Sequence, residues 1–272
     1  MHRAKIRCIG PEGFRLAAPP MTGPTSIRSL QQLTAEHGAF TAYNMRVNGA
    51  WTMGHDGHGA AELNLRRVMQ VVTDAVGGSL AGVRVLDLAS LEGMFALELA
   101  SRGAEVVAVE AREAHLAKAR WAAGELGLAN VDFIQADVRS LADLGLGTFD
   151  VVLCMGIVYP LRAAEAVELL RQVGLHAERL AVIEGQVSLR PRARAGTGGR
   201  EYHGSPVPEP PAPWSAVENT ESFWLTRPSL LNALGDAGFT SILETATPFV
   251  EELAAYRDHV QLVAFKGERV QL

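Results

Sequence analysis

The stretch that decides the fold is VRVLDLASLEGMFALELASRGAEVVAVEAR, residues 83–112. Its first apolar run, 83–88, predicts a buried strand, and the helix-forming run that opens at Gly93 stops at Gly103. A second apolar run, 106–110, predicts another strand, which completes a β-α-β unit with two parallel strands. In open parallel sheets, ligands bind beyond the carboxyl ends of the strands, so the residues after each strand are predicted to line a site.

Two acidic residues at the strand ends, Asp87 and Glu110, indicate the kind of ligand. Glu110 lies about 20 residues beyond the turn, the spacing at which a carboxylate binds ribose hydroxyls. A pyrophosphate needs glycine in the turn, whereas Ala89 and Leu91 stand there, and Asp87 would repel a phosphate. A cationic nucleoside, S-adenosylmethionine (SAM), suits this turn better. Dinucleotide binding and a unit without a ligand are the alternatives.

Four segments resemble the class I SAM-dependent methyltransferases. Residues 85–93, VLDLASLEG, resemble their first motif, V-L-D-L-G-C-G-x-G, with two of its three glycines absent. Residues 131–138, VDFIQADV, resemble the third strand with its adenine-contacting acid, and 149–159, FDVVLCMGIVY, resemble the fourth strand with its G-x-x-Y extension. The pattern SFWLTRPSL at 222–230, followed by AGF at 237–239, is typical of one branch. That branch is similar to the tRNA wobble-uridine carboxymethyltransferase and to related small-molecule methyltransferases.

This resemblance implies an α/β fold: a Rossmann-like, mostly parallel sheet of seven strands with helices on both faces. It implies SAM as cofactor and S-adenosylhomocysteine (SAH) as product. The residues it predicts to bind the cofactor are Asp87, Ala89, Ser90, Gly93, Glu110, Ala111, Asp137, Val138, Met155 and Gly156. For Asp137, a helix cap or a surface acid is the alternative reading.

The acceptor side is predicted from a hairpin and a long insertion. Asn48-Gly49 predicts a type I′ turn that places Arg46 opposite Trp51. The arginine-bearing, glycine- and proline-rich segment 190–218 is predicted to be a lid loop over the crevice, with a solvated loop as the alternative. The candidate acceptor-binding residues are Tyr43, Arg46, Arg194, Tyr202 and Trp224, and the candidate catalytic residues are Tyr159 and His203.

Three parts are predicted along the chain: a flexible arm at 1–24, a helix and hairpin cap at 25–58, and the methyltransferase domain at 59–272, which contains the lid insertion. His55-Asp56-Gly57-His58 is a weak metal signal, which we interpret as a cap of the next helix, so no metal is predicted. An alternative start at Met21 remains open.

The composition limits the kinds of partner and the compartment that we expect. The 272 residues carry a net charge of −5, which argues against a surface that coats nucleic acid. Two cysteines, Cys8 and Cys154, are not a disulfide framework. No apolar run is long enough to span a bilayer, and the first residues lack the apolar core of a secretion signal, so we expect a cytoplasmic protein without a membrane partner. A homodimer is left open.

The predicted function is therefore methyl transfer from SAM to a small molecule in secondary metabolism. Pro160 stands where many relatives carry a histidine after the tyrosine, and the insertion carries arginines, so an O-methyltransferase of a carboxylate or another anion is favoured. A carboxylate needs no base because it is already ionised near neutral pH. His203 is the expected base if the acceptor is a hydroxyl. The alternatives are a tRNA-modifying enzyme, which could use a carboxylated SAM, a SAM-binding module without turnover, and an NAD-dependent oxidoreductase.

Overall fold

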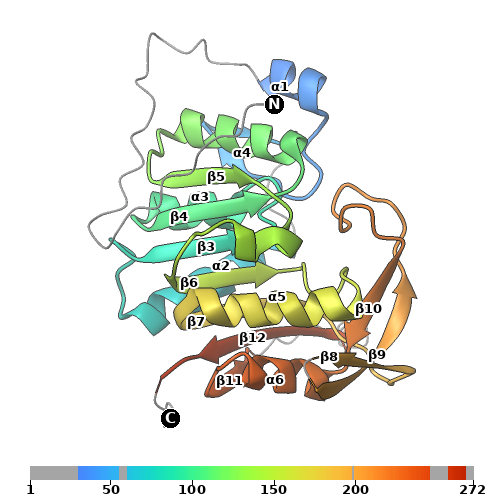
Figure 1. The fold of residues 1–272 in the computed structure, drawn as a ribbon. Helices are drawn as coiled ribbons and strands as arrows, with labels where there is room; N and C mark the ends of the chain where they lie inside the picture. Colours follow the sequence, from blue (N-terminus) through green and yellow to red (C-terminus); the bar gives the residue numbers. More distant parts are fainter. Residues whose placement is uncertain (1–29, 55–59, 198, 246–256, 268–272) are drawn as a thin grey trace.

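A central sheet of seven strands organises the chain. The computed structural model describes residues 30–54, 60–197, 199–245 and 257–267 (Figure 1). The strand order is β11-β12-β7-β6-β3-β4-β5. Strand β12 runs antiparallel to both β11 and β7, and all other neighbouring strands in this sheet are parallel. The strands are β3 (Arg84–Leu88), β4 (Glu105–Glu110), β5 (Val131–Gln135), β6 (Phe149–Met155), β7 (Ala177–Gln186), β11 (Ser241–Glu244) and β12 (His259–Phe265). This arrangement confirms the predicted Rossmann-like sheet.

Both faces of the sheet are covered, because its strands are apolar on both sides. Along β6, Val151 and Leu153 face one buried cluster, and Val152 and Cys154 face the other. The first cluster is completed by α2 (Ala60–Val76), α3 (Met94–Ser101) and α4 (Glu113–Leu126). The second is completed by the 3-10 helix η1 (Val138–Asp143), α5 (Ala163–His176) and α6 (Arg227–Asp236). Among the described helices, none is long and apolar enough to cross a membrane.

The N-terminal cap consists of α1 (Leu30–His37) and a hairpin of β1 (Arg46–Val47) and β2 (Ala50–Trp51). The pairing places Arg46 opposite Trp51, and Asn48 and Gly49 both have positive φ, which confirms the predicted turn. The Asn48 amide donates to the side chain of Glu125 on α4, so the hairpin lies against that helix. Residues 1–29 and the histidine-containing stretch 55–59 lie outside the described residues.

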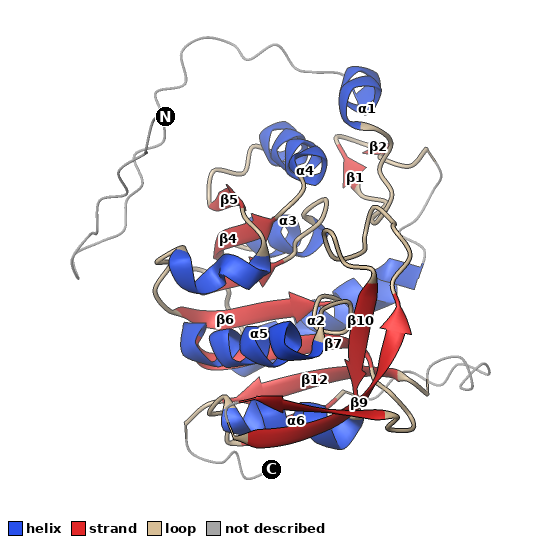
Figure 2. Cartoon of the chain, turned by 45° about the vertical axis from the view of Figure 1, so that its right-hand side comes forward, coloured by secondary structure: helices blue, strands red, loops and turns tan. Residues whose placement is uncertain are grey.

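The predicted lid loop is wrong in its secondary structure, because about half of it forms two strands of a second, antiparallel sheet. Its strands are β8 (Ala193–Thr197), β9 (Arg200–Pro208) and β10 (Glu221–Leu225). Buried aromatic residues explain this, since Tyr202 and Phe223 join the core cluster that includes α5 and α6. Gly204 allows the close pairing, because a Cβ there would lie 2.4 Å from the Trp224 carbonyl oxygen. Residues 209–220, which join β9 to β10, form the longest irregular stretch of this region among the described residues (Figure 2); we call them the roof segment.

Candidate active site

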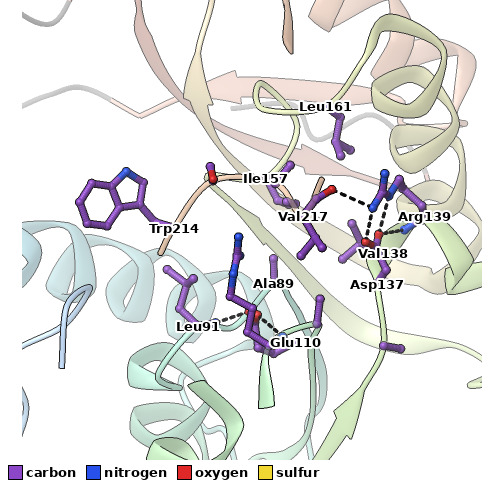
Figure 3. A pocket seen from close by; sticks show the side chains of 15 residues that line it. Ala89, Leu91, Glu110, Asp137, Val138, Arg139, Ile157, Leu161, Trp214 and Val217 are labelled. Atoms are coloured by element: carbon purple, nitrogen blue, oxygen red, sulfur yellow. Dashed lines mark hydrogen bonds and ion pairs between the residues drawn. The ribbon is translucent and has the colours of Figure 1, made fainter. Parts of the chain in front are cut away.

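Two adjoining cavities lie beyond the carboxyl ends of the parallel strands. The first, the β4–β5 compartment, is bounded by residues that follow β3, β4 and β5 and by 214–217 of the roof segment (Figure 3). Its free volume is about 40 Å³, room for only a few water molecules. The second, the β6–β7 compartment, has about 400 Å³ and is bounded by 41–43, 155–157, Tyr159 and Glu184. Ala89, Leu91, Ile157 and Trp214 border both cavities, so the two form one site.

The turn after β3 has the backbone conformation of a glycine-rich motif, although alanine and leucine stand at two of its positions. Ala89 and Leu91 have φ angles of 54° and 49°, in the left-handed region that favours glycine. Gly93, with φ 84°, is required for packing, because a Cβ there would lie 2.9 Å from the Cβ of Ala119 on α4. The Leu91 N–H donates to Oε2 of Glu110 at 3.0 Å. The turn therefore accepts backbone strain to place the Leu91 side chain between the two compartments.

Ala89→Gly is expected to stabilise the protein by about 1 kcal/mol, because relief of left-handed strain exceeds the added entropy of the unfolded chain. Urea unfolding monitored by circular dichroism measures the change. Ala117→Gly, inside α4, is the matched control and should destabilise by roughly 0.5–1 kcal/mol. Equal losses for both variants would contradict the strain assigned to Ala89.

Glu110 is a firmly ionised carboxylate at the floor of the β4–β5 compartment. Burial alone would raise its pKa, but His115 and the backbone N–H groups of Arg112 and Leu91 lower the pKa below its usual range. The Arg112 N–H donates to Oε1 at 2.9 Å, and Nδ1 of His115 lies 3.5 Å from the same oxygen. A carboxylate has about four acceptor positions, so Glu110 can still accept hydrogen bonds from ribose hydroxyls.

Asp87 is a buried carboxylate with one unpaired oxygen. It is 1% exposed, and its Oδ2 has no hydrogen-bond partner within the described part of the chain. Burial raises the pKa of Asp87 to about 7 with a further contribution from the charge of Glu110, although a hydrogen bond with the Ala96 backbone acts in the opposite direction. The hydroxyl of Ser90, also buried, lacks a partner as well. A buried carboxylate with one unpaired oxygen fits a cationic ligand group such as the ammonium of SAM.

Asp137 has the alternative role that the sequence left open, because it caps η1. Its side chain accepts the Arg139 backbone N–H at 2.9 Å and binds the Arg139 guanidinium at 2.6 Å. Burial would raise the pKa of Asp137, but these contacts with Arg139 lower it. Asp137 nevertheless lines the β4–β5 compartment (Figure 3).

The other predicted cofactor residues divide between the two compartments. Those that border a cavity are Ala89, Glu110, Ala111, Asp137, Val138, Met155 and Gly156. Asp87, Ser90 and Gly93 border neither cavity. The sequence missed the apolar wall of the β4–β5 compartment, which includes Leu161 and Ala216. Neither has a local signal, since both are ordinary apolar residues that tertiary structure brings to the site.

The roof segment is tied to the rim of the site by side chains that bind its backbone. The Arg139 guanidinium donates to the Val217 carbonyl at 3.0 Å (Figure 3), and the Arg112 guanidinium lies 3.5 Å from the Ala212 carbonyl. The Asn219 amide donates to the Pro160 carbonyl at 2.7 Å. Trp214, 58% exposed, extends over both compartments. The roof therefore closes the β4–β5 compartment and must move to admit an adenosyl group.

Two predicted residues do line the β6–β7 compartment: the candidate acceptor-binding Tyr43 and the candidate catalytic Tyr159. The Tyr159 ring contacts Trp224 edge to face, with the ring centroids 5.9 Å apart, so Trp224 helps to hold the Tyr159 ring in place. Gly185 leaves space for the Tyr159 ring, because a Cβ there would lie 2.7 Å from Cδ1 of that ring. Tyr43 packs in the same manner against Phe95.

The structure does not bring Arg46, Arg194, Tyr202 and His203 to either compartment. Arg46 is exposed at the hairpin. Arg194 is exposed and pairs with Glu201 at 3.2 Å, and the buried Tyr202 donates to Asp236 at 2.8 Å. The Nε2 of His203 lies 3.7 Å from Glu201.

The arginine-rich lid is thus corrected as well. The arginines at 190, 192, 194 and 200 are exposed and border neither compartment. The reason is the strand pairing, which was not expected from the glycine- and proline-rich composition. It pairs Arg194 with Glu201 on one face of the second sheet and Arg200 with Asp236 of α6 on the other face. The expectation of an anionic acceptor thereby loses one of its two supports, and Pro160 after Tyr159 is the other.

Two residues that the sequence did not suggest lie at the β6–β7 compartment. Glu184, near the end of β7, borders it, and its Oε1 contacts Nε2 of His259 on β12. This contact, more than any other, raises the pKa of His259 above its usual value. The position of Glu184 near a carboxyl strand end was a usable signal, but His259 is 75 residues away and only the β7–β12 pairing joins them.

Another buried carboxylate, Glu92, attaches the N-terminal cap to the turn after β3. Fully buried, it accepts the backbone N–H of Thr41 at 2.8 Å and those of Ala42 and Tyr43 at 3.0 Å. Nζ of the buried Lys118 lies 3.2 Å from Oε1 of Glu92. Glu92 thereby holds 41–43 as a wall of the β6–β7 compartment.

Comparison with known proteins agrees with this geometry. Residues 85–176 match a family model described as "Methyltransferase domain". A ubiquinone biosynthesis O-methyltransferase from Acinetobacter baumannii is 39% identical over 82 residues, 30% of this chain and 35% of that protein. The corresponding enzyme from Azotobacter vinelandii is 43% identical over 76 residues, 28% of this chain and 32% of that protein. The chain thus matches about a third of the length of these curated relatives.

Solved structures extend the likeness to most of the chain. The N-terminal domain of EvdMO1, solved in the presence of SAH and D-fucose, superposes with a TM-score of 0.68 at 25% identity, covering 88% of this chain and 95% of that one. The magnesium protoporphyrin IX methyltransferase from Synechocystis with bound SAM has a TM-score of 0.53 at 19% identity, covering 79% of this chain and 87% of that one. The predicted fold is confirmed, and residues 85–176 match a methyltransferase domain. These relatives do not name the wobble-uridine branch, which stays a prediction.

Proposed function

We propose that this chain, whose residues 85–176 are a methyltransferase domain of the SAM-dependent class, transfers a methyl group to a hydroxyl of a small-molecule acceptor. The observation that carries the proposal is the pair of acidic strand ends. Glu110 is ionised at the floor of one compartment, and Asp87 has a buried oxygen without a partner. This pattern suits a cationic adenosine derivative and is unfavourable for a phosphate.

The two compartments divide the ligands between them. Glu110 would bind the ribose of SAM in the β4–β5 compartment under the roof segment, and Asp87 would pair with the ammonium of the methionine part. When bound, SAM supplies an activated methyl group on its sulfonium. Leu91 and Ala89 border both cavities, so the methyl group would face the β6–β7 compartment. There Tyr43 and Tyr159 would orient the acceptor and exclude water, which is most of what an in-line displacement requires.

A hydroxyl suits the β6–β7 compartment better than a carboxylate does. Its volume of about 400 Å³ lies in the range of small-molecule sites. Glu184 borders it, while the arginines of the second sheet do not, and a carboxylate beside Glu184 would meet like charge. The named functions of the relatives agree, since one class is an O-methyltransferase and one structure was solved with D-fucose, a polyol.

Isothermal titration calorimetry with SAH, SAM and NAD tests the cofactor assignment. We expect binding of SAH and SAM but not of NAD. Glu110→Ala should weaken SAH binding about 100-fold, because it removes two charge-assisted hydrogen bonds to the ribose. Glu113→Gln, an exposed carboxylate three residues on, is the matched control and should leave the affinity unchanged. Binding of NAD, or unaltered SAH affinity in Glu110→Ala, would refute the assignment.

A further inference from the structure

Glu184, in the wall of the β6–β7 compartment, forms a polar pair with His259 behind it on β12. Glu184 is paired through its backbone with Met155 on one side and Gln261 on the other, so its position is fixed by three strands. The side chains of Glu184 and His259 are 15% and 29% exposed, so both are largely shielded from bulk solvent, and Glu184 borders the cavity. The pair is therefore rigidly placed and partly desolvated.

The two carboxylate oxygens of Glu184 have different surroundings. Oε1 contacts Nε2 of His259. Oε2 faces Gly156, since a Cβ there would lie 3.8 Å from it, and Gly156 itself borders the compartment. The Gly156 N–H donates to the Glu184 main-chain carbonyl at 2.9 Å, which fixes the distance between the two strand ends. One oxygen is thus anchored, and the other is directed to the side where an acceptor would lie.

The other titratable groups that face this compartment are poor proton acceptors. Burial, followed by the charge of Glu184, raises the pKa of the Tyr159 phenol to about 12, so it stays protonated. Burial, followed by the charges of Asp87 and Glu184, raises the pKa of Tyr43 further. Among the described residues that line the compartment there is no lysine, arginine or histidine. Glu184 is the carboxylate that lines it.

We propose that Glu184, oriented by His259, accepts the proton of a neutral acceptor hydroxyl during methyl transfer. The proposal rests on the function proposed above and names the acceptor class: an alcohol or a phenol. The acceptor oxygen forms a bond to the methyl carbon, and the carbon–sulfur bond breaks with its electron pair staying on sulfur, which gives neutral SAH. The hydroxyl proton passes to Oε2 of Glu184 and then to solvent. His259 is a positioning residue that holds Oε1.

Protonation of His259 should weaken this function. Glu184 first, and then Asp258, raises the pKa of His259, whereas its partial burial and Arg67 on α2 lower it. The net pKa is above the usual value, so the imidazole becomes an imidazolium as pH falls through a range above about 6.5. An imidazolium withdraws charge from Glu184, so kcat should decrease on the acid side and this limb should be reduced in His259→Gln.

The test compares acceptors that need a base with acceptors that do not. Wild type and Glu184→Gln are assayed by transfer of a labelled methyl group from SAM to each of four probes. D-fucose and catechol are neutral hydroxyl acceptors that need a base. The other two, 4-nitrophenol under alkaline conditions and benzoate, are already ionised and need none. Removal of a general base is expected to lower kcat for the neutral hydroxyl probe that wild type accepts by about 100-fold or more, with transfer to 4-nitrophenolate changed far less. SAH affinity should remain as in wild type, which shows that the variant is folded. Glu178→Gln, exposed at the opposite end of β7, is the matched control.

Three outcomes would overturn the proposal. They are equal loss on all accepted probes, unchanged transfer to the neutral hydroxyl probe in Glu184→Gln, and a wild-type protein that binds SAH but methylates benzoate alone or none of the hydroxyl probes. Absence of SAH and SAM binding in the wild type is a different result, because it removes the proposed function itself. The two failures are therefore distinguishable in the same set of measurements.

Discussion

Asp87→Asn is expected to stabilise the ligand-free protein and at the same time to weaken its binding of SAM. The folded-state pKa of Asp87 is about 7, against 3.8 for an unperturbed aspartate. The difference corresponds to a penalty on the order of 4 kcal/mol when the buried group is ionised. Because the folded-state pKa is the higher one, this penalty is complete above pH 7 and diminishes as pH falls toward 4. The stabilisation by Asn should therefore be about 2–4 kcal/mol at pH 8 and small at pH 5.

The affinity for SAM should change in the opposite direction. Ionised Asp87 attracts the ammonium group, so wild-type affinity is expected to decrease as pH falls below about 7, up to tenfold per pH unit. Asp87→Asn should bind SAM about 100-fold more weakly at pH 8 and without this pH dependence. Urea unfolding and calorimetry at both pH values measure the two effects. Asp132→Asn, exposed on β5, is the matched control. Loss of both stability and affinity in Asp87→Asn would show that Asp87 is a structural residue.

Glu92→Gln is expected to destabilise the protein by about 3–5 kcal/mol, because it leaves the buried Lys118 ammonium without its counter-charge. The amide also presents an N–H group where the carboxylate accepts N–H groups of 41–43, so the N-terminal wall of the β6–β7 compartment should loosen. Hydrogen exchange at Ala42 and Tyr43 should accelerate. Urea unfolding gives the loss of stability.

The control for this prediction is Glu98→Gln, which breaks the exposed Glu98–Arg102 pair on α3. Such surface pairs contribute roughly 0–1 kcal/mol, so the stability should hardly change. The double variant Glu92→Gln, Lys118→Met should recover part of the loss, because it removes the uncompensated charge. Similar effects of Glu92→Gln and Glu98→Gln would contradict the attachment of the cap through Glu92.

The sheet could be predicted from the sequence because its information is local. The apolar runs around Asp87 and Glu110 and the turn at Asn48-Gly49 each determine their own structure within a few residues. The second sheet could not be predicted in the same way, because glycines and prolines mask strands that form only when Tyr202 and Phe223 enter a core built by distant helices. Its glycine at 204 is a packing requirement of β10.

The same distinction between local and tertiary information separates the site residues that could be predicted from those that could not. Residues that directly follow a strand, such as Glu110 and Asp137, were found because topology places strand ends at one edge. Glu184 and His259 were missed because their contact depends on the pairing of β7 with β12. Arg194 and His203 were misplaced because side-chain direction in the second sheet depends on a register that the sequence did not reveal.

The roof segment has a consequence for the order in which the two ligands exchange. Trp214 borders both compartments, and the backbone around it is held by Arg112 and Arg139 beside the narrower one. An acceptor seated against Trp214 would block the outward swing that frees an adenosyl group. Turnover would then follow a compulsory sequence, with the nucleoside entering first and leaving last, and an acceptor in excess would slow the enzyme by trapping spent SAH beneath it.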